Sequence, residues 1–253
     1  MRYAGGKNLR QTLSRIICQI PPHGCYIELF CGSAAVLRHK RPGSCSVAVD
    51  RDPGAIAALA GRVPAGTRLE CCDAIEWLQR FDGQSPGRSP GAFIYLDPPY
   101  LETSCSSRLR YQHVLTPAQH AELLDILVHL PCPVAISGYW SELYGQRLSG
   151  WRSIHWPEIT RGGYARDQWL WMNYPEPAEL HDYRFLGDNY RERENLARQR
   201  RRWVERLQRM PRLKRFALLL ALREATAEAA VLPGPAALPL PAGGRRKARV
   251  GAR

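Results

Sequence analysis

Several absences restrict what this sequence can encode. None of the 253 residues falls in an apolar run long enough to cross a bilayer. The first residues carry charge but no apolar segment typical of a secretory signal, so we expect a cytoplasmic protein with no membrane partner. There is no Cys-x-x-Cys and no pair of histidines at metal-binding spacing, and we therefore predict no metal site. No internal repeat is present, which excludes a repeat architecture.

Cysteine, in contrast, is not scarce. Most of the eight cysteines lie in apolar stretches such as Cys25-Tyr-Ile-Glu-Leu-Phe-Cys31. In that setting a thiol is typically a small buried hydrophobe, so we predict free thiols rather than disulfides. The positions are Cys18, Cys25, Cys31, Cys45, Cys71, Cys72, Cys105 and Cys132.

Positive charge is in excess and is concentrated at one end of the chain. The sequence has 36 Lys and Arg against 23 Asp and Glu, a net charge of +13. Residues 188–253 hold 17 of the basic and 6 of the acidic residues (17 − 6 = +11), which leaves 19 basic and 17 acidic residues (+2) for residues 1–187. A basic excess points to a polyanionic partner, either nucleic acid or an anionic membrane surface.

Short apolar runs alternate with helical patterns, which predicts an α/β fold with a mostly parallel sheet. A Gly-Gly loop separates the last two runs, so we expect the sheet to end in an antiparallel hairpin. The predicted strands are 25–31, 45–50, 67–73, 92–97, 133–139, 151–159 and 167–174. The predicted helices are 6–20, 33–40, 53–61 and 117–130, the last opening with the N-cap pair Thr116-Pro117.

The last quarter of the chain has a different pattern. Residues 188–230 predict a basic helical hairpin that Asp188 begins and Pro211 interrupts, and residues 231–253 predict a disordered basic tail. We therefore divide the chain into a catalytic domain, residues 1–187, the hairpin and the tail. We interpret Trp203 as a core residue, packed against the catalytic domain or its partner helix, rather than a base-stacking one.

The first candidate for ligand binding is the turn that follows the first predicted strand. Small residues around Gly32 would let the backbone approach a ligand closely, and Asp50 ends the next strand at about the spacing of a ribose-binding carboxylate. The turn lacks Gly-x-Gly-x-x-Gly, which argues against a nicotinamide dehydrogenase. Taken alone, this pattern is equally consistent with an ordinary strand-to-helix turn.

The tetrapeptide Asp97-Pro-Pro-Tyr100 follows the fourth predicted strand. Ligands of open α/β sheets bind outside the carboxyl ends of the strands, where this tetrapeptide lies. Two prolines fix two φ angles and remove two backbone donors, which leaves a rigid edge of carboxylate and carbonyl acceptors beside an aromatic ring. Such a set suits a planar heterocycle with an exocyclic amino group, although a simple strand terminator would look the same.

Taken together, Tyr3-Ala-Gly-Gly-Lys7, Phe30-Cys-Gly-Ser and Asp97-Pro-Pro-Tyr100 resemble the S-adenosylmethionine-dependent DNA adenine-N6 methyltransferases, in particular the DNA adenine methylase (D12 class) family. Ile136-Ser-Gly-Tyr139 and Asp167-Gln-Trp-Leu-Trp-Met-Asn173 extend the resemblance over roughly residues 1–175. The resemblance implies a Rossmann-like class I methyltransferase sheet. It also implies a bacterial or phage-derived enzyme that methylates N6 of a flipped-out adenine in double-stranded DNA, as in restriction-modification.

The resemblance also implies roles for individual residues. Asp97, Pro98 and Tyr100 would be catalytic: the Asp97 carboxylate and the Pro98 carbonyl would accept from the target amino group, and Tyr100 would stack on the target base. The cofactor site would be formed by Tyr3, Lys7, Phe30, Gly32, Asp50 and Asp73. Within it, Asp50 would accept from the ribose hydroxyls and Asp73 from the amino group of the cofactor adenine.

Two features depart from the family pattern. Ala34 replaces the second glycine of the cofactor loop, which could narrow the approach to the cofactor. Only residues 74–96 lie between Asp73 and Asp97, too few for the target-recognition domain that larger members carry there.

Sequence-specific recognition of DNA must therefore come from elsewhere in the chain, or be weak. The candidates are Arg108, Arg110 and Tyr111 after the tetrapeptide, and Arg161 and Arg166 at the predicted hairpin. Solvated basic loops would show the same pattern. The basic hairpin is a further candidate for phosphate binding. The alternatives are the same chemistry on RNA adenine or on N4 of DNA cytosine, and a catalytically silent nucleic-acid-binding homologue. The oligomeric state and any partner nuclease stay open.

Overall fold

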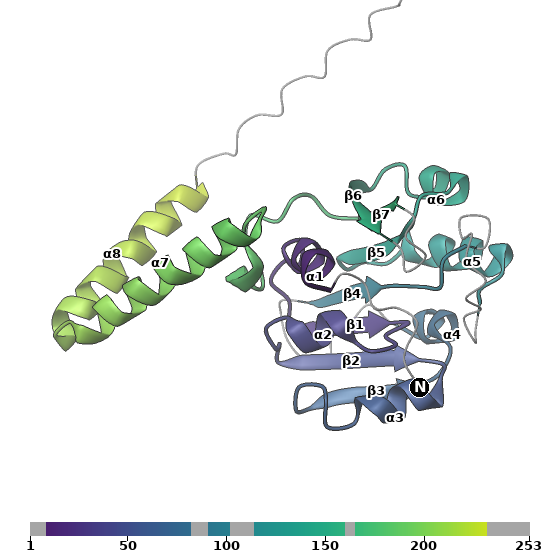
Figure 1. Cartoon of the computed structure of the whole chain (residues 1–253), viewed down its shortest axis with the longest axis horizontal. Helices are drawn as coiled ribbons and strands as arrows, with labels where there is room; N and C mark the ends of the chain where they lie inside the picture. The colour runs from purple at the N-terminus through teal and green to yellow at the C-terminus, as the bar shows by residue number, and fades with distance from the viewer. Residues whose placement is uncertain (1–8, 82–90, 102–113, 160–164, 232–253) are drawn as a thin grey trace, which may run out of the picture. The chain divides into compact units, whose positions relative to one another are not determined.

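The computed structural model describes residues 9–81, 91–101, 114–159 and 165–231, and its centre is a seven-stranded sheet. The strand order is β3-β2-β1-β4-β5-β7-β6, in which the first five strands are parallel and β7 is antiparallel to both of its neighbours. Figure 1 shows the strands stacked in this order, from β3 at the lower edge to the β6–β7 pair at the upper edge. The Rossmann-like α/β fold with a final antiparallel hairpin, predicted from the sequence, is confirmed.

The strands are short and the helices alternate with them along the chain. The strands are β1 (Cys25–Leu29), β2 (Cys45–Asp50), β3 (Thr67–Cys71), β4 (Ala92–Leu96), β5 (Val134–Tyr139), β6 (Arg152–Ile159) and β7 (Ala165–Met172). The helices are α1 (Leu9–Ile17), α2 (Ala35–His39), α3 (Pro53–Leu59), α4 (Ala74–Gln79), α5 (Pro117–Leu127), α6 (Glu142–Arg147), the 3₁₀ turn η2 (Tyr183–Phe185), α7 (Tyr190–Arg209) and α8 (Arg212–Val231).

The central strands are buried on both faces because helices cover both. Every residue of β1 and β4 is buried, and alternate side chains enter two separate apolar clusters. One cluster joins the sheet to α4, α5 and α6, and the other joins it to α1, α2 and α3. Continuous apolar runs are typical of such doubly covered parallel strands, which explains why the sequence pattern identified them.

Several predicted boundaries were wrong by a few residues, and two helices were missed. The first predicted strand ends at Leu29 rather than at residue 31, because the backbone turns at Phe30 with a left-handed φ of 53°. Helices α4 and α6 have only six residues each, too few to produce a clear periodic pattern. The predicted start of α5 is confirmed: Thr116 accepts from the Gln119 N–H, and Gln119 completes a capping box.

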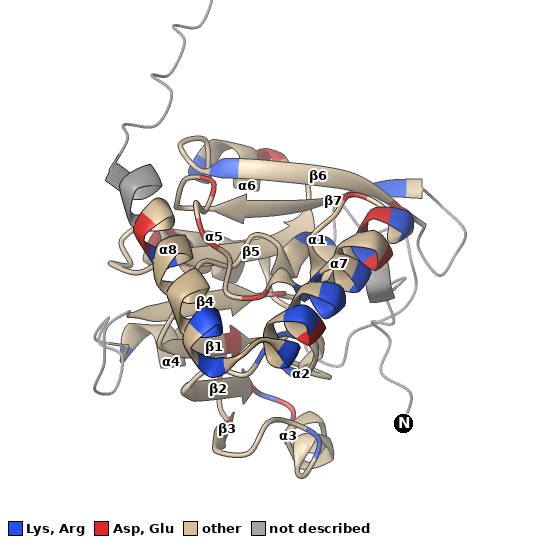
Figure 2. Cartoon of the chain, turned by 90° about the vertical axis from the view of Figure 1, so that its left-hand side faces the viewer, with Lys and Arg blue, Asp and Glu red and all other residues tan. Residues whose placement is uncertain are grey.

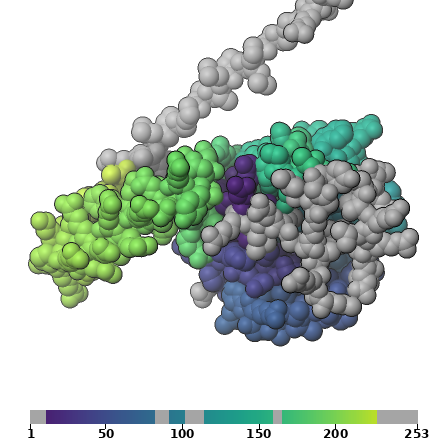
Figure 3. Space-filling model, in the orientation of Figure 1, coloured from purple at the N-terminus to yellow at the C-terminus, as the bar shows by residue number. Residues whose placement is uncertain are grey.

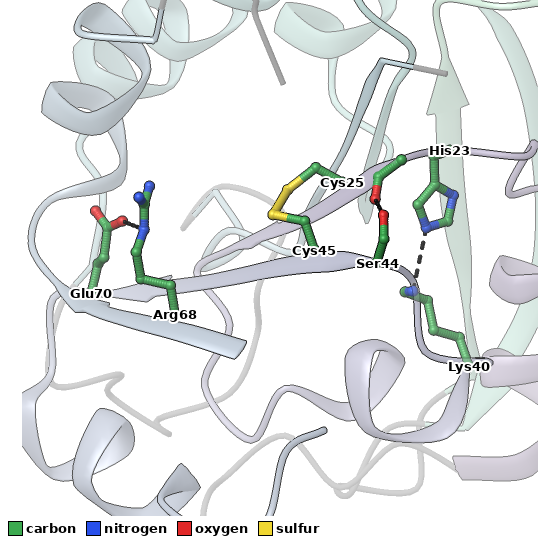
Figure 4. Close-up of a disulfide and its surroundings, with 8 residues drawn as sticks. His23, Cys25, Lys40, Ser44, Cys45, Arg68 and Glu70 are labelled. Carbon is green, nitrogen blue, oxygen red and sulfur yellow. Dashed lines mark hydrogen bonds and ion pairs between the residues drawn. A yellow bond between two sulfur atoms is a disulfide. The ribbon is translucent and has the colours of Figure 1, made fainter. Parts of the chain in front are cut away.

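The prediction of free thiols was wrong for one pair. Cys25 and Cys45 lie directly opposite each other at the start of β1 and β2 and form a disulfide (Figure 4). Their Cα atoms are 4.4 Å apart, a separation that sequence spacing alone does not reveal. Five other cysteines are free, of which only Cys31 and Cys132 are buried; Cys105 lies outside the described residues.

The chain divides into two compact units, Met1–Arg193 and Glu194–Arg253. The second unit contains most of α7 and all of α8, so the predicted pair of helices is present. The cap of α7 differs from the prediction, because the Asn189 side chain, not Asp188, accepts from the Glu192 N–H (3.0 Å). The predicted basic tail lies outside the described residues, apart from Val231 at the end of α8.

The surface of α7 and α8 is unusually open. No described side chain of either helix is buried, and in Figure 3 they are the green-to-yellow part of the surface. Trp203 is 60% exposed, so it is not buried against its partner helix, which was one of the two packings predicted for it. Arginines recur along α7 (Figure 2). No helix within the described ranges combines the length and apolarity that a bilayer span requires.

Candidate functional site

The sheet order places one reversal point at its centre. From β1 the chain passes to β2 and β3 on one side, and it then returns to β4 on the other side. In open α/β sheets, ligands bind outside the carboxyl ends of the strands at such a reversal. The turn after β1 and the tetrapeptide after β4 are therefore neighbours at the position where the fold favours a ligand. The tetrapeptide is hydrogen-bonded to the last residue of β1, since the Asp97 N–H donates to the Leu29 carbonyl (3.5 Å).

The turn after β1 has an uncommon backbone conformation. Phe30, Gly32 and Ala34 all have positive φ angles, of 53°, 49° and 48°. The Gly32 N–H donates to Asp50 Oδ2 (2.8 Å), and the Asp52 N–H donates to Oδ1 of the same carboxylate (2.9 Å). Asp50, 8% exposed, thus fixes the turn against the end of β2, and each of its oxygens keeps a lone pair for a further donor.

Asp73 follows β3 and begins α4 rather than ending the strand. Its Oδ1 accepts from the Ile75 N–H (2.8 Å) and the Glu76 N–H (3.3 Å), as an N-cap does. Its Oδ2 lies 3.9 Å from the guanidinium of Arg51. The predicted cofactor residue therefore has a structural role that the sequence analysis did not assign.

Asp97 is held from the adjacent strand. The Ser137 hydroxyl of β5 donates to Asp97 Oδ1 (2.8 Å). Ser137 is fully buried, and its oxygen lies 3.0 Å from the hydroxyl of Tyr95, which is 2% exposed. A chain of two buried hydroxyls thus ends on the carboxylate.

Tyr100 lies in an aromatic and polar layer above β5 and β7. Its ring is 4.2 Å from that of Tyr139, centroid to centroid, and the Arg166 guanidinium lies 5.4 Å from the centre of the Tyr139 ring. The Tyr100 hydroxyl lies 3.0 Å from the side-chain amide of Gln168, which is fully buried.

The amide of Gln168 has three polar neighbours that fix its orientation. With the nitrogen toward Tyr100 and Glu158, it donates to the Tyr100 hydroxyl (3.0 Å) and to Glu158 Oε2 (3.2 Å), and its oxygen accepts from the Gly138 N–H (3.1 Å). The opposite orientation would place an amide oxygen against a carboxylate and leave the Gly138 N–H without this acceptor, so we assign the first.

A buried carboxyl lies one residue before the end of β1. Glu28 accepts from the Leu37 N–H (2.7 Å) and from the Tyr26 hydroxyl (3.0 Å), both at Oε2. Burial raises its pKa to about 7, partly offset by these two hydrogen bonds, and the Asp97 charge adds to the rise. Glu28 thereby ties β1 to α2 behind the candidate ligand-binding turn.

The structure brings together part of the predicted site. Phe30, Gly32, Asp50, Asp73, Asp97, Pro98 and Tyr100 all follow the carboxyl ends of parallel strands β1 to β4, and Arg166 reaches the same edge through Tyr139. Tyr3, Lys7, Arg108, Arg110, Tyr111 and Arg161 lie outside the described residues. Within the described ranges, no group of three or more metal-ligating side chains comes together.

Sequence reasoning assigned no role to Ser137, Tyr139 or Gln168, although it quoted the segments that contain them. One signal could have identified two of them. Ser137 and Gln168 are polar residues inside strands that are otherwise apolar, and such a residue must find a partner when it is buried. Which partner it finds depends on strand register, which the sequence does not give.

No family model matches the sequence, and no curated protein matches it. The fold resembles several solved structures at low sequence identity. One is the SAM-dependent methyltransferase from Agrobacterium tumefaciens, with 17% identity, a TM-score of 0.42, and coverage of 64% of this chain and 60% of that one. Another is the N-methyltransferase NodS from Bradyrhizobium japonicum, with 13% identity, a TM-score of 0.44, and coverage of 66% and 93%.

A third is the precorrin-6y C5,15-methyltransferase from Geobacter metallireducens, with 10% identity, a TM-score of 0.44, and coverage of 69% and 92%. The chain thus spans less than two thirds of the Agrobacterium protein. Similarity at this level does not transfer an activity or a substrate from those proteins to this chain.

Proposed function

We propose that this chain transfers a methyl group from S-adenosylmethionine to N6 of a flipped-out adenine in double-stranded DNA. The observation that carries the proposal is the position of Asp97-Pro-Pro-Tyr100. It follows the central strand β4 at the reversal point of the sheet, is hydrogen-bonded to the last residue of β1, and has its carboxylate held by a buried hydroxyl.

The described residues fit the cofactor. Asp50 and Asp73 follow neighbouring strands β2 and β3, and each has acceptor capacity left after its backbone hydrogen bonds. That suits a ligand with ribose hydroxyls at one carboxylate and an amino group at the other. S-adenosylmethionine supplies the methyl group on a positively charged sulfur, which keeps the electron pair of the C–S bond when the methyl leaves.

The protein's own contribution to the reaction is electrostatic. An aromatic amine is a weak nucleophile because its lone pair is delocalised into the ring. In the proposed complex, the Asp97 carboxylate and the Pro98 carbonyl accept hydrogen bonds from the two N–H groups of the target amino group. These two hydrogen bonds localise the lone pair on the amino nitrogen. They also stabilise the positive charge that nitrogen gains until one of its protons leaves. Fixed acceptors of this kind contribute about 3 kcal/mol by analogy with an oxyanion hole.

The target base must leave the duplex, because its amino group is shielded there. Tyr100 and Tyr139 provide aromatic rings beside Asp97, and stacking on a ring offsets part of the unstacking cost. Arg166, at the rim of this layer, is suited to contact a phosphate or a base edge. We propose double-stranded DNA as the partner, with α7 contributing further phosphate contacts through its arginines.

The deciding experiment supplies labelled S-adenosylmethionine with either duplex DNA or RNA, followed by digestion and identification of the modified nucleoside. We expect N6-methyladenine from DNA. Methylated adenine from RNA would identify RNA as the substrate, and N4-methylcytosine from DNA would identify cytosine as the target base. The absence of any product together with absent cofactor binding would indicate a catalytically silent homologue.

A pair of variants tests the assignment of Asp97. Asp97→Ala removes the acceptor, so we expect at least about a hundredfold loss of kcat. Asp125→Asn, in the exposed part of α5, removes one carboxylate charge away from the site and is the matched control. Full activity in Asp97→Ala would exclude this residue from the reaction.

A further inference from the structure

We propose that Ser137 and Gln168 are positioning residues, which hold Asp97 and Tyr100 respectively in the orientation that methyl transfer requires. The inference rests on the proposed function and assigns a separate supporting residue to each end of the tetrapeptide. The last parallel strand and the first antiparallel strand, β5 and β7, hold the two ends of the tetrapeptide that follows β4.

Ser137 has one hydroxyl proton and three possible acceptors within reach, namely the Asp97 carboxylate, the Leu96 carbonyl and the Tyr95 hydroxyl. The Asp97 carboxylate is closer (2.8 Å) than the Leu96 carbonyl (3.3 Å), and it is charged, so the proton belongs on the bond to Asp97. The Ser137 oxygen in turn lies 3.0 Å from the Tyr95 hydroxyl, which then donates to it. Both residues are buried, so bulk water does not compete for these hydrogen bonds, and the donor order runs from Tyr95 through Ser137 to Asp97.

The consequence for Asp97 is geometric. A carboxylate on a strand end can rotate about two side-chain bonds, and a donor on Oδ1 from a rigid neighbouring strand fixes its plane. The second oxygen and the lone pairs that face the substrate are then directed before the substrate arrives. Preorganised acceptors avoid the cost of reorienting dipoles during the reaction, so this contact should affect the chemical step.

Gln168 acts on the other end of the tetrapeptide. Its register partner across the β5–β7 pair is Tyr139, whose ring packs against that of Tyr100. The same amide reaches the Tyr100 hydroxyl, Glu158 of β6 and the Gly138 N–H of β5. Two strands and the tetrapeptide after β4 thus contact one buried side chain, and its nitrogen fixes how the Tyr100 ring lies beside the Tyr139 ring. The target base would stack on the Tyr100 ring when it binds, before methyl transfer begins. The contact between Gln168 and Tyr100 should therefore affect binding of the target base.

The two contacts therefore predict different kinetic effects, which a merely structural role would not. We expect Ser137→Ala to lower kcat by about 10- to 100-fold, the range for a lost hydrogen bond to a charged group, with little change in KM for DNA. Ser137→Thr, which keeps the hydroxyl and suits a strand, should recover most of kcat. Ser46→Ala removes another buried serine hydroxyl, on β2, and is the matched control.

We expect Gln168→Met to raise KM for DNA roughly tenfold with kcat changed less than about threefold. Tyr100→Phe removes only the oxygen that Gln168 holds and should have a similar effect. If Gln168 acts through this oxygen, the double variant should be no worse than either single variant, because residues in one network are not additive. Tyr95→Phe should lower kcat, as Ser137→Ala does. If Ser137→Ala does not fold, Tyr95→Phe takes its place in the experiment.

The experiment measures initial rates on unmethylated duplex DNA with labelled S-adenosylmethionine. Urea unfolding and calorimetric cofactor binding serve as readouts of the intact fold. Unchanged kcat in folded Ser137→Ala, or independent effects of Gln168→Met and Tyr100→Phe, would overturn the inference while leaving the proposed function in place. A wild-type chain that binds DNA and cofactor but methylates no nucleic acid would overturn both.

Discussion

At the scale of single residues, three aspartates lie at the carboxyl ends of the parallel strands β2, β3 and β4, and each is held by a different partner. Asp50 accepts from the turn after β1, Asp73 caps α4, and Asp97 accepts from Ser137. Each carboxylate therefore has a structural contact in addition to its proposed ligand. A variant at any of them can lose activity through folding as well as through chemistry, and the two effects have to be separated.

Variants of Asp73 allow the contribution of this carboxylate to folding to be measured separately from its proposed contact with the ligand. Asp73→Ala removes the acceptor at the start of α4, and we expect it to lower the free energy of unfolding by about 1 kcal/mol. Asp73→Asn keeps an acceptor of the same shape and should stay within a few tenths of a kcal/mol of wild type. Urea unfolding measures both, and equal losses in the two variants would show that the charge beside Arg51, rather than the cap, stabilises this end of β3.

Glu28 predicts a specific pH dependence. Its pKa is about 7 in the folded chain against 4.5 for an unperturbed glutamate, so the folded state keeps a proton that the unfolded state loses between these values. The resulting stabilisation is fully present below pH 4.5 and is lost as pH rises through 7. Glu28→Gln removes this dependence. From pH 4.5 to about pH 8, the stability of Glu28→Gln relative to wild type should rise by up to roughly 3 kcal/mol.

Urea unfolding of both proteins across this pH range measures the difference. Subtracting the wild-type curve matters because His23, whose pKa burial lowers to about 3, changes stability in the opposite direction between pH 3 and 6.5. A difference that does not vary with pH would mean that Glu28 ionises equally in the folded and unfolded chains.

At the scale of elements, the sheet is joined by contacts that cross from strand to strand. The β5–β7 pair holds the tetrapeptide after β4, and the Cys25–Cys45 disulfide joins β1 to β2 at their amino ends, away from the candidate site. The contacts that hold the proposed reacting groups thus lie at the carboxyl end of β4, whereas the disulfide lies at the amino ends of β1 and β2.

The disulfide gives a prediction at this scale. A cross-link between residues 25 and 45 reduces the freedom of the unfolded chain, so Cys25→Ser with Cys45→Ser should lower the free energy of unfolding by about 3 kcal/mol. Peptide mapping under non-reducing conditions should recover the linked peptides. Because the candidate site lies at the other end of β1 and β2, we expect cofactor binding to be retained below the unfolding transition. Recovery of both cysteines as free thiols would contradict the prediction.

At the scale of the whole molecule, the basic excess and the candidate site belong to different parts of the sequence. Helix α7 carries Arg201 and Arg202 on exposed positions, whereas the residues of the candidate site follow the strands of the sheet. If these arginines contact phosphates, replacing both with Gln should weaken DNA binding and reduce the slope of log affinity against log salt by up to about 2. Arg62→Gln with Arg80→Gln, at exposed positions beyond α3 and α4, removes the same charge and should leave the slope unchanged.

Salt titration of DNA binding measures the slope for both double variants. Equal reductions in the two would show that binding responds to net charge alone and not to contacts made by α7. Circular dichroism of the α7 variant must match wild type, because exposed helices of this kind depend on few tertiary contacts.

Much of the fold followed from the sequence because its signals are local. Continuous apolar runs identified the buried strands β1, β2, β4 and β5, and Thr116-Pro117 identified the start of α5. The six-residue helices α4 and α6 were missed, since two turns produce no reliable period. The predicted packing of Trp203 against its partner helix was wrong because a helical pattern shows which residues share a face, but not whether the next helix covers that face.

The sequence by itself determined the α/β alternation, the concentration of charge in the last quarter and the three motifs whose order resembles a methyltransferase family, because each depends only on neighbours along the chain. Only the tertiary structure decided which residues support those motifs. Ser137 reaches Asp97, Gln168 reaches Tyr100 and Cys25 meets Cys45 across strands distant in sequence, and such contacts depend on strand order and register. A one-residue slip in register would turn each of these side chains to the opposite face.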